Sequence, residues 1–304
     1  GLKPGDEVIV PTWTYVATAE VIALLGLNPV FIDVDESTFN IDIQQLESVV
    51  TEKTKAIVPV HLYGQCCDMA AIMAFAEKHS LFVVEDTAQA IGAEYTFSDG
   101  SKKQAGTIGH VGTTSFFPSK NLGCYGDGGA IFVQDEKLYN TIKGICNHGE
   151  LGVKYYHDIV GVNSRLDTMQ AVVLNAKLKR LKGYESARNH VADYYNQAFK
   201  EVDEIETPLV SNFSTHVYHQ YTMKIKNGKR DDLKGFLATK EIPAMIYYPL
   251  PLHHQKAYSG YLKGTENLTI SEKLAHEVIS LPIHTEMRED QLSYITETVK
   301  SFFK

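Results

Sequence analysis

The chain has 304 residues, of which 44% are hydrophobic and 22% are charged, a balance that excludes intrinsic disorder and allows a large buried core. Its 29 basic and 37 acidic residues give a net charge of -8, which disfavours nucleic-acid phosphates and anionic membranes as partners. The four cysteines lack CxxC spacing, and no apolar run approaches the length of a membrane helix. We therefore expect a cytoplasmic protein of about two domains that binds neither nucleic acid nor membrane.

Short apolar segments alternate with amphipathic segments over the first half of the chain, which predicts strands that alternate with helices. The expected strands cover residues 7–11, 29–34, 56–60, 81–85, 112–117 and 129–133. The expected helices cover residues 16–25, 43–50, 69–79 and 136–146. This order predicts the α/β class, with a mostly parallel sheet that helices cover on both faces.

The second half begins with residues 148–166, which are rich in Gly, His and Tyr and are typical of a loop that acts as a hinge or interface. Two long helices are expected next, over residues 167–182 and 184–200. The remaining expected elements are strands over 218–225 and 244–248 and helices over 230–240, 271–279 and 288–303. These patterns predict a large domain over residues 1–200 and a smaller α+β domain over residues 201–304.

Polar residues follow three of the expected strands, at the carboxyl ends where open α/β sheets bind their ligands. These segments are Pro11-Thr12-Trp13-Thr14-Tyr15, Glu85-Asp86-Thr87-Ala88-Gln89 and Ser115-Phe116-Phe117-Pro118-Ser119-Lys120. The third continues into a glycine-rich stretch over residues 123–129. We therefore expect an aromatic ring, a carboxylate, a hydroxyl and a lysine amine to converge on one crevice.

Lys120 lies between an apolar Phe-Phe-Pro stretch and glycines, where partial desolvation lowers the pKa of an amine and makes it a Schiff-base nucleophile. Paired with Asp86, it suggests a pyridoxal phosphate site, because that cofactor needs an amine for its aldehyde and an acid beside its pyridine nitrogen. A carboxylate about 4 Å from a pyridinium contributes roughly 4 kcal/mol at an effective dielectric of 20. Tyr15 could stack on the ring. Taken singly, Lys120 and Tyr15 are equally explained as a snorkelling lysine and a buried aromatic, and Asp86 is better explained as a helix cap.

Other cofactor signals are weak in this sequence. The glycines of residues 123–129 do not match GxGxxG, which disfavours a nicotinamide enzyme. No HExxH motif or Cys/His zinc spacing is present, so we expect no metal site. We interpret His253 and His254 as a polar loop or a substrate contact rather than as metal ligands.

Five ordered motifs together resemble the DegT/DnrJ/EryC1/StrS aminotransferases, which are fold-type I pyridoxal-phosphate enzymes that aminate keto groups on nucleotide-linked sugars. The motifs are Pro11-x-x-Thr14-Tyr15-x-Ala17-Thr18, Val60-His61-Leu62-Tyr63-Gly64, Glu85-Asp86-Thr87-Ala88-Gln89, Ser115-Phe116-x-x-x-Lys120 and Gly126-Asp127-Gly128-Gly129. The resemblance spans the whole chain. It is closest to the subgroup that aminates carbon 3 of UDP-2-acetamido-2-deoxy-3-keto-glucuronic acid for bacterial surface polysaccharide, with carbon-4 amination as the alternative.

The resemblance implies a role for each matching residue. Lys120 would bond the cofactor aldehyde and then move protons, while Asp86 would pair with the pyridine nitrogen. The further cofactor contacts would be Tyr15 on the ring, Gln89 on its hydroxyl, Ser115 on the phosphate and Asn163 on the phosphate of a neighbouring subunit. Arg165 would bind a carboxylate of glutamate or of the sugar, and the weaker substrate candidates are Tyr63, Tyr248 and His253. A homodimer with shared active sites is therefore expected.

Two other functions remain open in the sequence. The related sugar dehydratases carry histidine in place of the lysine, so Lys120 argues against that activity. Family members also carry a segment before the equivalent of Gly1, with a helix that binds the cofactor phosphate through its N-terminus. Either this chain is a piece of a longer protein, or it has lost part of the phosphate site. In the second case it would be a cofactor-dead protein that binds sugar nucleotides.

Overall fold

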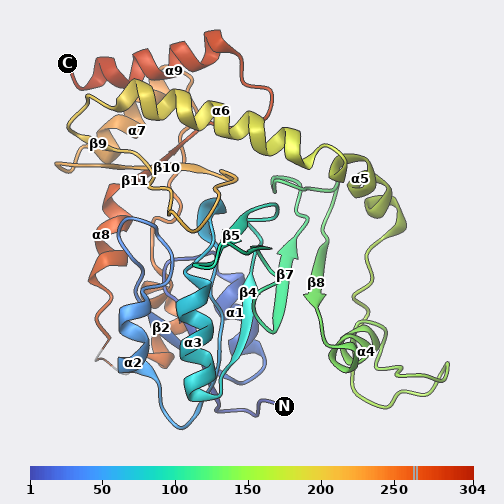
Figure 1. Ribbon diagram of the computed structural model, residues 1–304. Coiled ribbons are helices and arrows are strands. Elements are labelled where there is room, and N and C mark those ends of the chain that lie inside the picture. The colour runs from blue at the N-terminus through green and yellow to red at the C-terminus, as the bar shows by residue number, and fades with distance from the viewer. Residues whose placement is uncertain (263, 265) are drawn as a thin grey trace.

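A six-stranded sheet forms the centre of the N-terminal unit in the computed structural model, which describes residues 1–262, 264 and 266–304. The strand order is β2-β1-β3-β4-β7-β8, and only the edge pair β7–β8 is antiparallel. The strands are β1 (Glu7–Pro11), β2 (Asn28–Ile32), β3 (Thr54–Ile57), β4 (Phe82–Asp86), β7 (Val111–Ser115) and β8 (Gly129–Val133). The predicted mostly parallel α/β sheet is confirmed (Figure 1).

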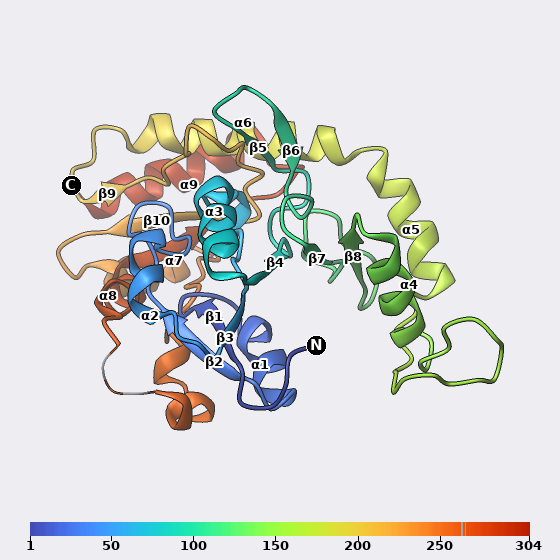
Figure 2. The same cartoon turned by 60° about the horizontal axis from the view of Figure 1, so that its bottom comes forward.

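Successive residues of β1 pack into two different hydrophobic cores, which explains why the strand is apolar throughout. Val8 and Val10 pack with residues of α1 (Ala17–Leu24), whereas Ile9 packs with residues of α2 (Leu46–Val49) and α3 (Met69–His79). Figure 2 shows the sheet between α3 on one face and α1 on the other. Each such buried side chain contributes about 1.5–3 kcal/mol, so both faces need a cover.

Short elements between the main strands were not predicted from the sequence. They are the 3-10 turn η2 (Leu62–Gly64) and a hairpin of β5 (Glu94–Thr96) and β6 (Lys102–Gln104). The helix predicted over residues 43–50 is present as the 3-10 turn η1 (Ile43–Gln45) followed directly by α2. The hairpin strands have three residues each, and all three residues of β6 are exposed. Segments of three residues are too short to show a hydrophobic periodicity.

The C-terminal unit is built on an antiparallel sheet with the order β11-β10-β9, formed by β9 (Ile205–Glu206), β10 (Tyr221–Ile225) and β11 (Val278–Leu281). Its core contains side chains of α6 (Leu181–Phe199), α7 (Arg230–Thr239) and α9 (Glu289–Phe302). Val191, Tyr195 and Phe199 of α6 belong to this core. The division at residue 200 remains a prediction, although the packing associates α6 with the C-terminal elements.

Two sequence predictions in this unit were wrong. The segment 244–248 forms only an isolated bridge between Met245 and Ser280, because the prolines at 243 and 249 on either side cannot donate to a strand ladder. The expected helix over 271–279 ends earlier, as α8 (Thr269–Glu277), and the buried residues that follow form β11. Helical and strand-like apolar runs meet there without a turn residue, so periodicity alone could not separate them.

Segments of the C-terminal part of the chain between α7 and β11 pack against the N-terminal unit. Leu252 of η3 (Leu252–His254) and Tyr258 of η4 (Lys256–Tyr261) pack in the core beneath α1. Leu274 of α8 packs with Trp13, which follows β1. The two units therefore share buried side chains around the carboxyl end of the sheet. No helix in the described ranges is both long and apolar enough to cross a membrane.

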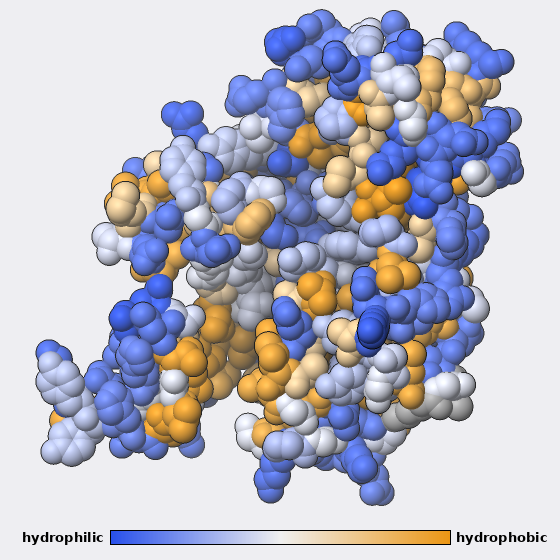
Figure 3. Space-filling model, turned by 180° about the vertical axis from the view of Figure 1, so that it is seen from behind, coloured by the Kyte–Doolittle hydropathy of each residue, from blue (hydrophilic) through white to orange (hydrophobic). Residues whose placement is uncertain are grey.

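An arm extends away from both units beside β8 (Figures 1 and 2). It consists of α4 (Glu136–Ile145), the segment 147–167 and α5 (Thr168–Leu178). Residues 148–166 form no named helix or strand, and only Asn163 makes an isolated bridge. Their action as a hinge or interface stays a prediction. The arm exposes several large apolar side chains, including Val160 (98% exposed) and Met169 (81%). Figure 3 shows hydrophobic surface gathered on both sides of the gap between the arm and the main body.

Candidate active site

A cavity of about 700 Å³ lies at the carboxyl end of the sheet, between the two units. Six of the predicted site residues line it together, namely Tyr15, Asp86, Gln89, Ser115, Lys120 and Tyr248. They converge because β1, β4 and β7 run parallel and present their carboxyl ends at one edge. The opposite wall comes from the C-terminal unit, with residues that include Arg188, His219, Gln220, Met245 and Pro282.

Lys120 lies in the turn that follows β7, where its backbone N–H donates to the carbonyl of Phe117 at 2.9 Å. Burial lowers the pKa of its amine, and the negative charge of Asp86 opposes that shift. The amine is therefore partly desolvated and electrostatically coupled to the carboxylate, as the sequence predicts. A neutral amine is thus reached at lower pH than for a lysine in water.

Asp86 is the last residue of β4, and hydrogen bonds fix both oxygens of its carboxylate. Oδ2 accepts from the hydroxyl of Thr18 at 2.9 Å, and Oδ1 accepts from the N–H of Ala88 at 3.0 Å. Sequence reasoning assigned no role to Thr18, although it is the second threonine of the Thr-Tyr-x-Ala-Thr motif.

Gln89 is buried, and its amide bridges two segments. Its Oε1 accepts from the backbone N–H of Tyr63 at 2.8 Å, and its Nε2 donates to the hydroxyl of Tyr248 at 3.1 Å. Burial raises the pKa of Tyr248, so this phenol stays protonated. One N–H of Gln89 remains for a ligand on the cavity side.

Tyr15 and Ser115 present different groups to the cavity. The Tyr15 ring is 58% exposed, which leaves a face free for a flat heterocycle. The hydroxyl of Ser115 accepts from the N–H of Phe117 at 3.2 Å, so its own hydrogen is free to donate. A partly buried amine, a fixed carboxylate and an open aromatic face in one cavity fit pyridoxal phosphate.

The structure does not bring Tyr63 to the cavity wall. Its ring is only 2% exposed, its hydroxyl accepts from Trp13 Nε1 at 3.1 Å, and it donates to the backbone carbonyl of Tyr247. Tyr63 therefore supports the segment that carries Tyr248. A direct substrate contact by Tyr63 stays a prediction.

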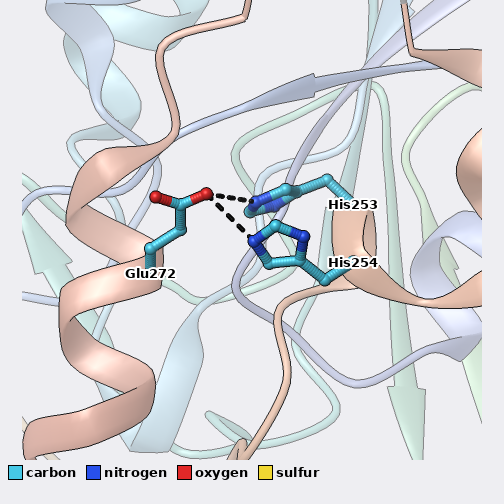
Figure 4. A group of neighbouring side chains, drawn as sticks. All are labelled: His253, His254 and Glu272. Carbon is cyan, nitrogen blue, oxygen red and sulfur yellow. Dashed lines mark hydrogen bonds and ion pairs between the residues drawn. The ribbon is translucent and has the colours of Figure 1, made fainter.

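His253 also lies outside the cavity lining, in a cluster with His254 and Glu272 (Figure 4). Its Nδ1 is 2.7 Å from the hydroxyl of Thr12, and Glu272 Oε1 lies 3.4 Å from His253 Nε2 and 2.9 Å from His254 Nε2. Burial and the neighbouring His254 lower the pKa of His253. These hydrogen bonds account for the arrangement, and the absence of a metal site stays a prediction.

Asn163 and Arg165 lie on the arm rather than in the cavity of their own chain. Both are exposed, and Asn163 forms an isolated bridge with Asn147, whose Oδ1 accepts from Arg165 Nη1 at 2.8 Å. This placement accords with the expected action of Asn163 in a neighbouring subunit. The roles of both residues stay predictions.

Residues 1–300 match the DegT/DnrJ/EryC1/StrS aminotransferase family. This chain belongs to that family. It is accordingly a pyridoxal-phosphate-dependent aminotransferase, and solved structures similar to it include forms with bound cofactor. The predicted fold class, enzyme class and cofactor are confirmed.

Three curated relatives are similar over nearly all of this chain. A "pleiotropic regulatory protein" of Geobacillus stearothermophilus is 48% identical over 100% of this chain and 80% of its own length. A UDP-2-acetamido-2-deoxy-3-oxo-D-glucuronate aminotransferase of Pseudomonas aeruginosa is 45% identical over 93% of this chain and 76% of its own. A UDP-N-acetyl-3-dehydro-alpha-D-glucosamine 3-aminotransferase of Acidithiobacillus ferrooxidans is 42% identical over 98% and 78%.

A solved structure agrees with the fold. The crystal structure of a DegT/DnrJ/EryC1/StrS aminotransferase from Brucella abortus superposes with a TM-score of 0.93 at 40% identity. The match covers 100% of this chain and 81% of the other.

Proposed function

We propose that this protein transfers an amino group from glutamate to carbon 3 of a UDP-linked 3-keto-N-acetylhexosaminuronate, in the cytoplasm, for bacterial surface polysaccharide. The observation that carries the proposal is the electrostatic coupling of the partly buried Lys120 amine to the fixed Asp86 carboxylate in one cavity. The names of the relatives from P. aeruginosa and A. ferrooxidans support a UDP-sugar substrate aminated at carbon 3.

When bound, pyridoxal phosphate supplies an electron-accepting ring that carries the amino group between donor and acceptor. Lys120 would hold the cofactor and provide the base, because its lowered pKa makes the free amine available near neutral pH. Nζ would accept a proton from the donor's α-carbon and later deliver one to the sugar carbon.

The neighbouring side chains would orient the ring. Asp86, held by Thr18 and Ala88, would keep the ring nitrogen protonated. Tyr15 would cover one face, Gln89 would donate its remaining N–H to the ring hydroxyl, and Ser115 would donate to the phosphate. The walls together would limit the access of water to the reacting atoms.

We extend the proposal to a homodimer with shared active sites. Asn163 and Arg165 would act in the partner's cavity, and the apolar residues of the arm would be covered in the interface. The exposed apolar side chains of the arm include Leu151, Val153, Val160, Val162, Met169 and Val172. A mixture of the inactive variants Lys120→Ala and Arg165→Ala should regain activity only if sites combine residues of two chains.

The substrate is tested by mass spectrometry of products from a panel of UDP-linked keto sugars incubated with glutamate and the holoenzyme. Amination of the 3-keto uronate with release of 2-oxoglutarate is expected, and a Lys120→Ala sample serves as the blank. Exclusive amination of a 4-keto sugar would overturn the carbon-3 assignment. A colourless purified protein that still binds UDP-sugar would overturn the enzymatic proposal.

A further inference from the structure

Arg188, in the middle of α6, is only 9% exposed and has no acidic partner in the described part of the chain within 4.0 Å. Its Nη1 donates to the backbone carbonyls of Tyr218 at 2.8 Å and of His219 and Ile283 at 3.3 Å. Burial lowers its pKa to about 10, which leaves the guanidinium charged at neutral pH. Buried charges in proteins are usually paired, so this cation is exceptional.

The unpaired edge of this guanidinium is the one suited to a carboxylate. Nε is buried and has no hydrogen-bond partner, and Nη2 makes no hydrogen bond to any residue that the structure describes. Nη2 is not among the buried unpartnered atoms, so it reaches accessible surface, and Arg188 lines the cavity. Nε and Nη2 form one side of the planar group, which binds both oxygens of a carboxylate in parallel.

Among the described residues that line this wall, none carries a negative charge that would compensate Arg188. His219 is close enough to Lys120 and Arg188 that both positive charges, together with burial, lower its pKa and keep the ring neutral. Gln220, in the same wall, is neutral, and its Oε1 is buried without a partner. The two acids of the lining, Asp86 and Asp127, lie on segments of the sheet side.

We propose that Arg188 is the carboxylate-binding residue of the wall opposite the sheet, and that it receives a carboxylate of a substrate through its accessible Nη2. The inference rests on the proposed function, which supplies two sources of this group, the amino donor and the sugar uronate. Arg165 alone could not pair with every carboxylate of these substrates. A neutral polar residue at position 188 would leave such a carboxylate unpaired at this wall.

Steady-state kinetics of Arg188→Lys and Arg188→Gln distinguish the two sources. Three KM values are measured separately, for glutamate, for a 3-keto uronate and for the uncharged hexosamine analogue of that uronate. Loss of a charged hydrogen bond predicts a rise of about tenfold to a hundredfold in the KM of one carboxylate ligand, with a smaller change in kcat. If glutamate is the ligand, its KM rises with either sugar. If the uronate is the ligand, only the charged sugar is affected.

Arg180→Gln is the matched control, because it removes the same charge from an exposed position just before α6. Its KM values should equal those of the wild type. Equal KM changes for all three substrates in the Arg188 variants, or a fall in melting temperature with unchanged KM values, would show a purely structural arginine and overturn the proposal.

A crystal structure of the wild-type holoenzyme with glutarate tests the same contact without turnover or folding of a variant. Glutarate carries the two carboxylates of the donor but no amino group. If the amino donor is the ligand, a carboxylate oxygen of glutarate should lie within hydrogen-bond distance of Arg188 Nη2. The proposal is overturned if neither glutarate nor the uronate analogue places a carboxylate on Nη2. This experiment remains decisive if the enzyme aminates none of the proposed sugars, so the two failures are distinguishable. A second crystal structure, with UDP-N-acetylglucosaminuronate, tests the uronate. If the uronate is the ligand, its carboxylate should lie within hydrogen-bond distance of Arg188 Nη2.

Discussion

The two walls of the cavity differ in how their polar groups are arranged. On the sheet side, Lys120 and Asp86 follow adjacent strands, and opposite charges offset one another. On the C-terminal side, Arg188 is buried and His219 is half-buried. Among the described residues neither has an acidic partner, and the hydrogen bonds of the guanidinium go to backbone carbonyls. The charges of the sheet wall balance one another, and this wall fits the cofactor. The positive charge of the opposite wall is balanced only when an anionic ligand binds.

This difference assigns catalysis to the sheet wall and substrate binding to the opposite wall. Changes on the sheet wall should remove catalysis, because they alter the groups that hold the cofactor and move protons. Changes on the opposite wall should affect the binding of one substrate or the stability of the fold. The following variants test that separation in order of the expected effect.

Replacing Lys120 by Ala should have the largest effect. The variant loses the amine that bonds the cofactor and moves protons, so turnover should fall by at least roughly 10³-fold and the visible colour of bound cofactor should change. Absorbance spectra and product formation provide the measurement, with the exposed Lys103→Ala as control. Wild-type turnover in Lys120→Ala would contradict the assignment of catalysis to the sheet wall.

Asp86→Asn keeps the shape of the side chain and removes its charge. A loss of about 4 kcal/mol of pairing predicts a fall of roughly 10³-fold in the rate of amino-group uptake from glutamate. The half-reaction is followed by stopped-flow absorbance without any sugar. A decrease smaller than tenfold would mean that the carboxylate does not face the ring.

The sequence predicts the sheet wall far better than the opposite wall, and the reason is physical. Asp86 and Lys120 each lie in a contiguous motif at the end of an apolar strand, and parallel strands must bring such ends together. Arg188, by contrast, is one polar residue on an amphipathic helix, where a charge normally indicates the solvated face. Its burial depends on carbonyls 30 and 95 residues further along the chain, which no local pattern records.

The same limit applies to the fold. The helix over Met69–His79 is predicted because its apolar residues follow the helical period. β11 was missed since the helix before it shares its apolar character. Thr18 was missed as a partner of Asp86, because its contact spans 68 residues.

Behind the second wall, His216 makes the fold sensitive to acid. Complete burial lowers its pKa to about 3, whereas an unfolded histidine titrates near 6.5. As pH falls below about 6.5, the unfolded chain gains a proton that the native chain does not, so stability decreases. Between pH 6.5 and 5 the wild type should lose about 2 kcal/mol more than His216→Gln.

Urea unfolding at the two pH values measures this difference, and above pH 7 the two proteins should show parallel dependence on pH. The exposed His190→Gln serves as the control and should retain the acid sensitivity of the wild type. Identical slopes for wild type and His216→Gln below pH 6.5 would show that other groups cause the acid response.

Thr18→Val should have the smallest effect. It removes one of the two hydrogen bonds to the Asp86 carboxylate, which predicts a loss of about 1 kcal/mol and a rate decrease of about fivefold in the glutamate half-reaction. Thr18→Ser retains the hydroxyl and should restore the rate. A Ser variant as slow as the Val variant would assign the effect to packing instead.

Borohydride reduction of the holoenzyme, followed by peptide mass spectrometry, tests the central claim most directly. The reagent fixes the cofactor to the amine that holds it. We predict the added mass of the phosphopyridoxyl group on the peptide that contains Lys120 and on no other lysine. Labelling of a different lysine, or of none in a protein supplied with the cofactor, would contradict it.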